Sequence, residues 1–271
     1  MLKTEDEPLA SVALRVAERG QVTPRDVQKM RRDLYSDGFI NRIEAQALLT
    51  LEHAIRKRHP SWDEFYVEAL TDYFMQNRDE LILGDDELAF LKAGIMENGK
   101  PADPTELRLL LNLVFHAKSC PAPLIEFTRE ALLHSIKTSS VAIFGEGGRT
   151  AGSVDEQDVQ ALRRLVYGRG GSDGLQVSED EALWLMSIDH ATHDAVHHPG
   201  WRQLFVKAEA MYLLFAGASP ECIDPAEVNW LERHLPCNGI LTPNGRALLA
   251  YLRAEATRIH PSFEVFGRMS A

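Results

Sequence analysis

A cluster of histidines near residue 190 is the set of side chains in this sequence best suited to chemistry. His190, His193 and His197 lie at i, i+3 and i+7, so they share one face if the segment is helical. Imidazole is a common ligand of zinc, copper and nickel, and the i, i+4 spacing of His193 and His197 is typical of helical metal sites. The spacing therefore predicts a transition-metal site, such as a zinc site, and leaves open a structural, exposed or pH-sensing histidine face.

A second set of candidate ligands lies in an acidic loop near residue 37. Asp33, Asp37 and Glu44 stand at the first, fifth and twelfth positions of one stretch, with Gly38 at the sixth and Ile40 at the eighth. This pattern resembles the calcium loop of the EF-hand family. The resemblance implies helix–loop–helix units and calcium binding by the three acids. The all-helical, acidic repeats described below are also similar to the tellurite-resistance TerB-like proteins.

The same acids fit a purely structural role in helix capping. In a capping box, the side chain of the cap residue accepts from a backbone amide three positions later, and the acid at that position accepts from the amide of the cap. Thr23 with Asp26 and Asn41 with Glu44 have this spacing. The pattern therefore predicts two capped helix starts, whether or not an ion binds.

The sequence contains no recognisable catalytic constellation. Cys120, Cys222 and Cys237 do not lie in a reactive frame, and no GxSxG nucleophile elbow occurs. The glycine-rich runs lack the Lys-Ser/Thr pair of a phosphate-binding loop. These features favour a protein that is not an enzyme.

Helical periodicity extends over most of the chain. We expect helices over residues 8–19, 24–35, 41–57 and 62–75, and a looser copy of this plan over residues 83–135. Gly20 is a typical helix stop and Pro24 a typical first helical residue. His59 precedes Pro60, and a residue in that position disfavours helix, so a break is expected there.

The second half of the chain repeats the first. Asp26-Val27-Gln28 recurs as Asp158-Val159-Gln160, and Trp62 recurs as Trp201, where we expect core packing. Self-similarity at this scale indicates one supersecondary unit used several times. The sequence predicts an all-α fold of four helix–loop–helix-type units, starting near residues 22, 83, 154 and 223. These units are expected to form two tandem lobes, residues 1–137 and 154–271, joined by a linker over residues 138–153, with short extended contacts where the loops near Val22 and Ile40 pair.

Composition narrows the function classes. The net charge of −11 argues against a nucleic-acid partner and against docking on anionic membranes. No apolar run approaches the roughly eighteen residues of a membrane span, and the acidic first residues do not resemble a signal peptide. Three cysteines without a spacing pattern indicate a reducing compartment. We therefore expect a cytoplasmic protein.

These observations favour a non-enzymatic helical repeat protein that acts in protein–protein interaction or regulation, because repeats of this kind expose grooves that suit a partner helix. The partner is expected to be another protein or a second copy of the chain. The alternative is a metal-binding protein, which would hold calcium through the loop from Asp33 to Glu44 or a transition metal through the face from His190 to His197.

Overall fold

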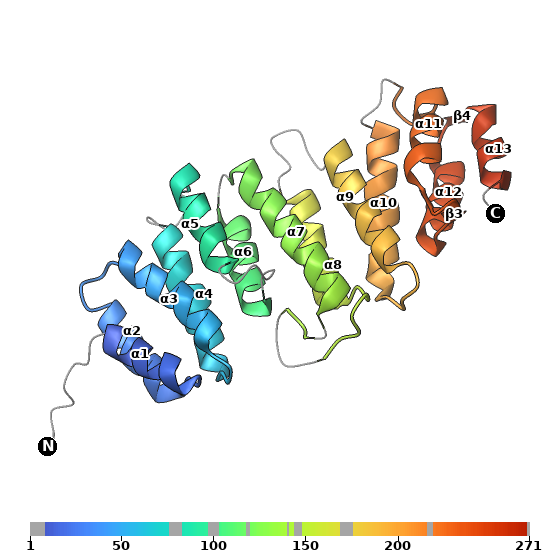
Figure 1. Cartoon of the computed structure of the whole chain (residues 1–271). Coiled ribbons are helices and arrows are strands. Elements are labelled where there is room, and N and C mark those ends of the chain that lie inside the picture. Colours follow the sequence, from blue (N-terminus) through green and yellow to red (C-terminus); the bar gives the residue numbers. More distant parts are fainter. Residues whose placement is uncertain are drawn as a thin grey trace, which may run out of the picture. The chain divides into compact units, whose positions relative to one another are not determined.

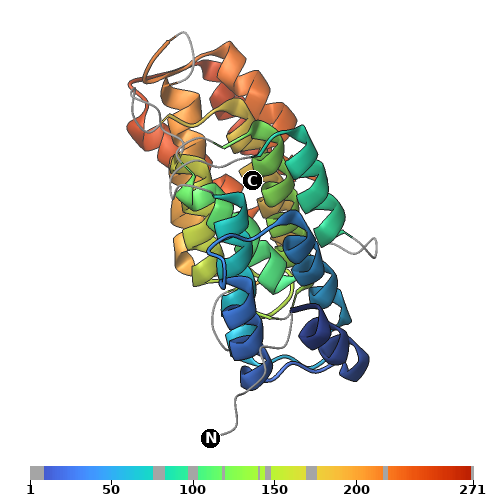
Figure 2. The same cartoon turned by 90° about the vertical axis from the view of Figure 1, so that its left-hand side faces the viewer.

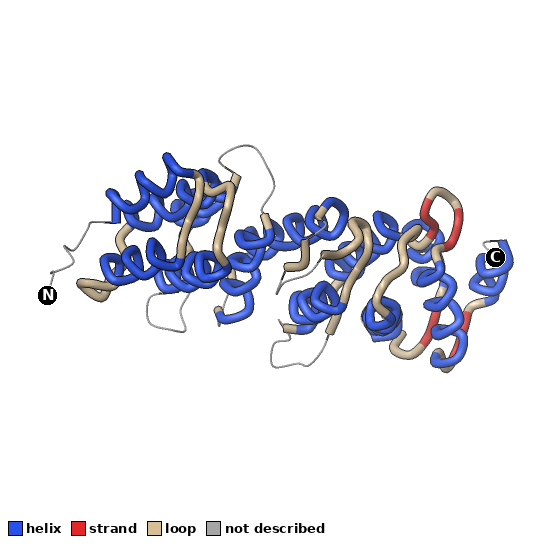
Figure 3. Tube along the Cα trace, turned by 90° about the horizontal axis from the view of Figure 1, so that it is seen from below, coloured by secondary structure: helices blue, strands red, loops and turns tan. Residues whose placement is uncertain are grey.

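The structure is a computed structural model that describes residues 9–75, 83–96, 103–117, 120–139, 141–143, 148–168, 176–215 and 219–269. These ranges contain thirteen helices and four strands of two residues each, so the expectation of a mostly helical fold is confirmed (Figures 1 and 3). Within these ranges no helix combines the length and the apolar character that crossing a bilayer requires. The chain divides into two compact units, Met1–Leu132 and Leu133–Ala271.

The first unit is built from helices that pack around buried aromatic side chains. Helices α1, α2 and α3 pack together, and α4 packs on α2, α3 and α6; the first helices, blue in Figure 2, lie side by side. Trp62, Phe65 and Tyr66 of α4 are fully buried at the centre. The helices are α1 (Leu9–Arg19), α2 (Pro24–Leu34), α3 (Arg42–Ala54), α4 (Pro60–Phe74), α5 (Asp85–Ile95), α6 (Pro104–His116) and α7 (Ala122–Thr138), whose last residues belong to the second unit.

The predicted capping boxes form and set where the helices begin. The Asn41 side chain accepts from the Glu44 amide at 3.1 Å, and the Glu44 carboxylate accepts from the Asn41 amide at 2.8 Å. Thr23 and Asp26 do the same for α2. Each box satisfies amides that a helix start leaves without an intrahelical partner.

The expected pairing of the loops near Val22 and Ile40 was wrong. Gln21 instead forms a parallel bridge with Lys57, and the Val22 amide donates to the Lys57 carbonyl at 3.1 Å. The Gly20 carbonyl accepts from the amides of Arg56 and Lys57, which fixes the segment before α2 against the segment between α3 and α4. Near Ile40 the next amide, that of Asn41, is already bonded to its own capping box.

The second unit uses the same kinds of elements. Helix α10 packs on α8, α9 and α12, and its Trp201 is fully buried. Strands β1 and β4 pair in parallel, and β2 and β3 form a hairpin whose turn, Asn238-Gly239, has positive φ at both residues, as a type I′ turn requires. The elements are α8 (Glu156–Tyr167), α9 (Glu179–Thr192), α10 (Pro199–Phe215), β1 (Cys222–Ile223), α11 (Pro225–His234), β2 (Pro236–Cys237), β3 (Ile240–Leu241), α12 (Pro243–Glu255), β4 (Arg258–Ile259) and α13 (Pro261–Met269).

A buried ion pair fixes the segment that precedes α8. Arg149 Nη1 donates to both carboxylate oxygens of Asp158, at 2.7 and 2.8 Å, and the two side chains are 3% and 0% exposed. Arg149 also donates to the Ser135 carbonyl in α7. Burial raises the pKa of Asp158 to about 6, although the Arg149 charge opposes the shift. Residues 140 and 144–147 of the predicted linker lie outside the described residues, and the domain boundaries stay a prediction.

Replacing Arg149 by alanine should destabilise the second unit by about 3–5 kcal/mol, because it leaves the Asp158 carboxylate buried without its cation. Urea denaturation followed by circular dichroism measures this loss. Arg163→Ala, which removes an exposed arginine from the same helix as Asp158, should change the unfolding free energy by less than about 0.5 kcal/mol. Equal losses for the two variants would contradict a structural role for the buried pair.

Candidate functional site

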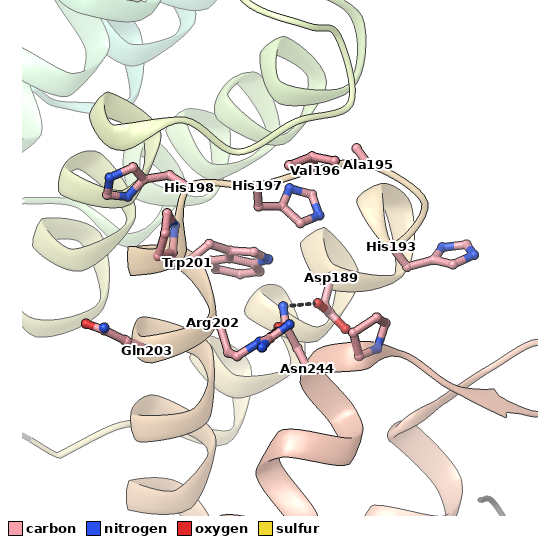
Figure 4. A pocket seen from close by; sticks show the side chains of 12 residues that line it. Asp189, His193, Ala195, Val196, His197, His198, Trp201, Arg202, Gln203 and Asn244 are labelled. Carbon is pink, nitrogen blue, oxygen red and sulfur yellow. Dashed lines mark hydrogen bonds between the residues drawn. The ribbon is translucent and has the colours of Figure 1, made fainter.

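A polar pocket of about 500 Å³ opens in the second unit, where the end of α9 and the starts of α10 and α12 meet. Figure 4 shows side chains from these three helices and from the segment between α9 and α10 around one space. The lining residues that matter for its chemistry are Asp189, His193, His197, Trp201, Arg202 and Asn244.

Asp189 forms the floor of the pocket. Its carboxylate is 2% exposed and accepts one hydrogen bond on each oxygen, from Thr242 Oγ1 at 2.5 Å and from Asn244 Nδ2 at 2.7 Å. Thr242 is the N-cap of α12, so helix capping places both donors beside Asp189. Arg202 Nε donates to Asn244 Oδ1 at 3.2 Å. A chain of hydrogen bonds therefore links α10, α12 and α9.

Trp201 presents a buried donor to this pocket. The indole is fully buried, and its Nε1 has no hydrogen-bond partner among the described residues. Figure 4 shows the indole nitrogen facing the space above Asp189. A buried N–H group without an acceptor costs about 1–3 kcal/mol, so this group is a place where an acceptor from outside the chain would add stability.

His197 supplies a second donor beside Trp201. Its Nδ1 accepts from the Val154 amide at 3.1 Å, which assigns the ring proton to Nε2 in the neutral form. Nε2 is buried and makes no hydrogen bond of standard geometry within the described chain. Burial lowers the pKa of His197, against smaller opposing effects of the Thr192 carbonyl and the Asp189 charge. The ring is therefore neutral at pH 7.

The three histidines singled out from the sequence do not share a helix face. Helix α9 ends at Thr192, so the expectation of a helix through His197 was wrong. His193 is the C-cap, and its Nδ1 bonds to the His190 carbonyl at 2.8 Å, which closes the helix end. His190 Nε2 lies 3.2 Å from the Leu235 carbonyl, and His197 turns to Val154. Of these three histidines, His193 and His197 line the pocket and His190 is not among its described lining residues.

The acidic loop also directs its side chains to the backbone. Asp37 Oδ1 accepts from the Phe39 amide at 3.1 Å, Glu44 accepts from the Asn41 amide, and Asp33 accepts from the Leu9 amide. In the part of the chain that the structure describes, no group of three or more His, Cys, Asp or Glu side chains is arranged to hold a metal ion. Calcium binding by Asp33, Asp37 and Glu44 stays a prediction, as does a transition-metal site at His190, His193 and His197.

The first unit has a closed ionic cluster at the positions that form the pocket in the second. Arg58 lies between Glu52 and Asp103, with Nη1 2.6 Å from Glu52 Oε1 and Nη2 3.0 Å from Asp103 Oδ2. The other Glu52 oxygen accepts from Trp62 Nε1. Asp63 lies 3.6 Å from the same guanidinium. Side chains of this unit therefore satisfy its own indole and its own carboxylate.

Acids outnumber cations in this cluster. Burial, helped by the charge of Asp103, raises the pKa of Glu106 to about 9, and burial also raises the pKa of Glu52. Glu106 is 2% exposed and completes the capping box of α6 with Asp103. The raised pKa favours the protonated form of the buried Glu106 at neutral pH.

The two units differ at a few matched positions. Asp189 occupies the same position in α9, counted from the N-cap, that Glu52 occupies in α3. The aspartate side chain is one methylene shorter than the glutamate side chain. His197, before His-Pro, replaces Arg58, so the long side chain that fills the cluster in the first unit is absent. Arg202 replaces Asp63. These exchanges remove the long side chain of Arg58 and one of the acids that surround it in the first unit, and they leave space beside Asp189 in the second.

Sequence reasoning missed Arg202, Asn244 and the free indole N–H of Trp201. One sequence signal could have indicated the difference between the two units. Aligning His59-Pro60 with His198-Pro199 places His197 opposite Arg58 and Arg202 opposite Asp63. Comparison with protein-family models, with curated proteins and with solved structures found no match for this chain.

The same substitution in both units separates the two indole environments. Trp62→Phe should destabilise the protein by about 1–3 kcal/mol more than Trp201→Phe, because only Trp62 donates to a buried carboxylate. The loss of volume is the same in the two variants, so the difference in unfolding free energy isolates the hydrogen bond. Equal losses would show that the two indoles have equivalent surroundings.

A raised pKa makes stability depend on pH. Glu106 holds its proton in the folded state up to about pH 9, whereas an unfolded glutamate loses it near 4.5, so unfolding free energy should fall as pH rises through this window. Glu106→Gln cannot ionise. The unfolding free energy of this variant minus that of the parent should therefore be larger at pH 9 than at pH 5, by at least about 1 kcal/mol. Urea titrations at the two pH values measure this, and a difference that does not change with pH would contradict it.

Proposed function

We propose that this chain is a non-enzymatic helical repeat protein that acts by binding a partner protein, with recognition centred on the polar pocket of the second unit. In this proposal the scaffold consists of four three-helix units, α2–α4, α5–α7, α8–α10 and α11–α13, arranged as two tandem lobes. Capping boxes at α2, α3, α6, α8, α9 and α11 support a common unit. The partner is another protein or a second copy of the chain.

The free indole N–H of Trp201 is the observation that carries this proposal. Buried donors in folded proteins are nearly always bonded, so one that lines a pocket indicates that an acceptor arrives from elsewhere. The matched indole of the first unit, Trp62, has its acceptor within the chain. The pocket is therefore a difference between two otherwise similar units, as a recognition site on a repeated scaffold would be.

The chemistry of the pocket supports binding rather than catalysis. Its described lining contains no serine, threonine, cysteine or lysine that would serve as a nucleophile. The Asp189 carboxylate is held by Thr242 and Asn244, and it makes no hydrogen bond to His197 that would orient a general base. The fixed side chains suit a rigid recognition surface.

Metal binding is the second candidate function. Cys237 Sγ lies 4.0 Å from the His193 ring at Nδ1, and thiolate and imidazole are the ligands that zinc prefers. Because Nδ1 donates to the His190 carbonyl, Nε2 is the ring nitrogen that a metal would use. This pair shares one member with the predicted histidine site. The calcium loop from Asp33 to Glu44 belongs to the same alternative.

Affinity capture tests the proposed function. The parent chain and Arg163→Ala, an exposed change on α8 outside the pocket lining, should enrich the same protein. Arg202→Ala should lose it, because the variant removes the cation of the pocket without removing buried volume. Capture that is equal for all three chains, or absent from all three, would contradict recognition through the pocket. If zinc or calcium instead raises Tm, and His193→Ala or Glu44→Gln abolishes that rise, metal binding takes its place.

A further inference from the structure

We infer that the pocket of the second unit binds a carboxylate group, with one oxygen on the Trp201 indole N–H and the other on the Arg202 guanidinium. This inference rests on the proposed function, since it names the group that the pocket recognises. The carboxylate belongs either to a protein chain, as an acidic side chain or a C-terminus, or to a small organic acid.

The first unit shows this arrangement with a carboxylate of its own. Glu52 bridges an indole and a guanidinium: one oxygen accepts from Trp62 Nε1, and the other lies 2.6 Å from Arg58 Nη1. Indole N–H and guanidinium groups are both donors only, and a carboxylate accepts on both oxygens. The fold therefore already uses a carboxylate to satisfy this pair of donors.

The second unit keeps the indole, places its guanidinium at another position, Arg202 in the place of Asp63, and lacks the bridging acceptor. Asp189 stands in the place of Glu52, but its two oxygens accept from Thr242 at 2.5 Å and from Asn244 at 2.7 Å rather than from the indole. Trp201 Nε1 has no partner, and the terminal nitrogens of Arg202 make no hydrogen bond or ion pair within the described ranges. The missing component is an acceptor with two oxygens, the geometry that a carboxylate supplies.

The charge balance of the pocket also admits an anion. Around Arg58, three carboxylates face one guanidinium, those of Glu52, Asp63 and Asp103, and the buried acid Glu106 lies near them. The matched positions in the second unit hold Asp189, Arg202, Thr242 and Gly245, which leave one carboxylate beside one guanidinium. An incoming anion would meet far less repulsion here than at the cluster of the first unit.

A cation fits this pocket less well. Among the described residues that line it, Asp189 is the only anionic side chain, and each of its oxygens already accepts a hydrogen bond. A cation would also approach Arg202 and leave the Trp201 N–H unsatisfied.

Nuclear magnetic resonance of the indole groups tests the inference directly. In the full chain labelled with ¹⁵N, the Trp201 indole signal is assigned with Trp201→Phe and then followed during titration with sodium propionate. We expect a saturable downfield proton shift of this signal, which an N–H that gains a charged acceptor shows, and no such shift with propionamide. The Trp62 signal serves as the internal control, because its N–H is already bonded to Glu52.

Two variants separate binding from structure. Arg202→Met keeps an unbranched apolar stem and removes the guanidinium with its charge, and it should weaken the apparent affinity for propionate at least tenfold. Arg163→Ala should leave that affinity unchanged. A shift of the Trp201 signal that propionamide reproduces, or that Arg202→Met retains in full, would overturn the assignment. A response to inorganic phosphate without one to propionate would overturn it as well.

Binding of matched peptides distinguishes the two sources of the carboxylate, a protein chain and a small organic acid. An acetylated pentapeptide with a free C-terminus, the same peptide amidated, and an amidated version with one glutamate distinguish a chain terminus from a side chain. Tighter binding of either acidic peptide than of propionate supports a protein source, and the reverse order supports a small acid. If propionate binds but no protein is captured, the carboxylate site stands and the protein-binding function fails. If capture depends on Arg202 but no carboxylate shifts Trp201, the function stands and this inference fails.

Discussion

The structure depends on satisfying the amides at the starts of many short helices. None of the described helices exceeds 17 residues, so a large share of their backbone groups lies near an end and lacks an intrahelical partner. Reciprocal capping boxes answer this need at α2, α3, α6, α8, α9 and α11. Because the boxes fix where each of these helices begins, they also fix which of its residues face the core. Helices α4 and α10, which carry the buried Trp62 and Trp201, begin instead at a histidine before proline, where His59 and His198 each accept from a backbone amide through Nδ1.

Differences at a few matched positions account for the contrast between the two units. A loss of one methylene at Asp189 and of a long cation at His197 turns a closed ionic cluster into a pocket, while the surrounding helices keep their caps and their buried indole. Buried ion clusters add little net stability over well-packed alternatives. Their replacement in one copy is therefore inexpensive for the fold, and it leaves hydrogen-bond donors available for another use.

Local features were predictable from the sequence, and long-range ones were not. The caps at Thr23 and Asn41, the break at His59-Pro60 and the buried Trp62 and Trp201 follow from adjacent residues, and the structure confirms them. The end of α9 was misplaced because a side-chain bond from His193 to the His190 carbonyl stops the helix before His197. The pairing of Gln21 with Lys57 and the contact of Asp189 with Asn244 join residues far apart in the chain, which periodicity does not reveal.

The double role of Asp158 has a consequence for local opening of the chain. The same carboxylate accepts from the Asp155 amide in the capping box of α8 and from the Arg149 guanidinium. Arg149 in turn holds the Ser135 carbonyl of α7. Release of Arg149 would leave the capping carboxylate of α8 buried without its cation, so detachment of the segment before α8 weakens the first turn of α8. Amide hydrogens from Asp155 to Val159 should exchange with solvent together, at the rate set by release of Arg149.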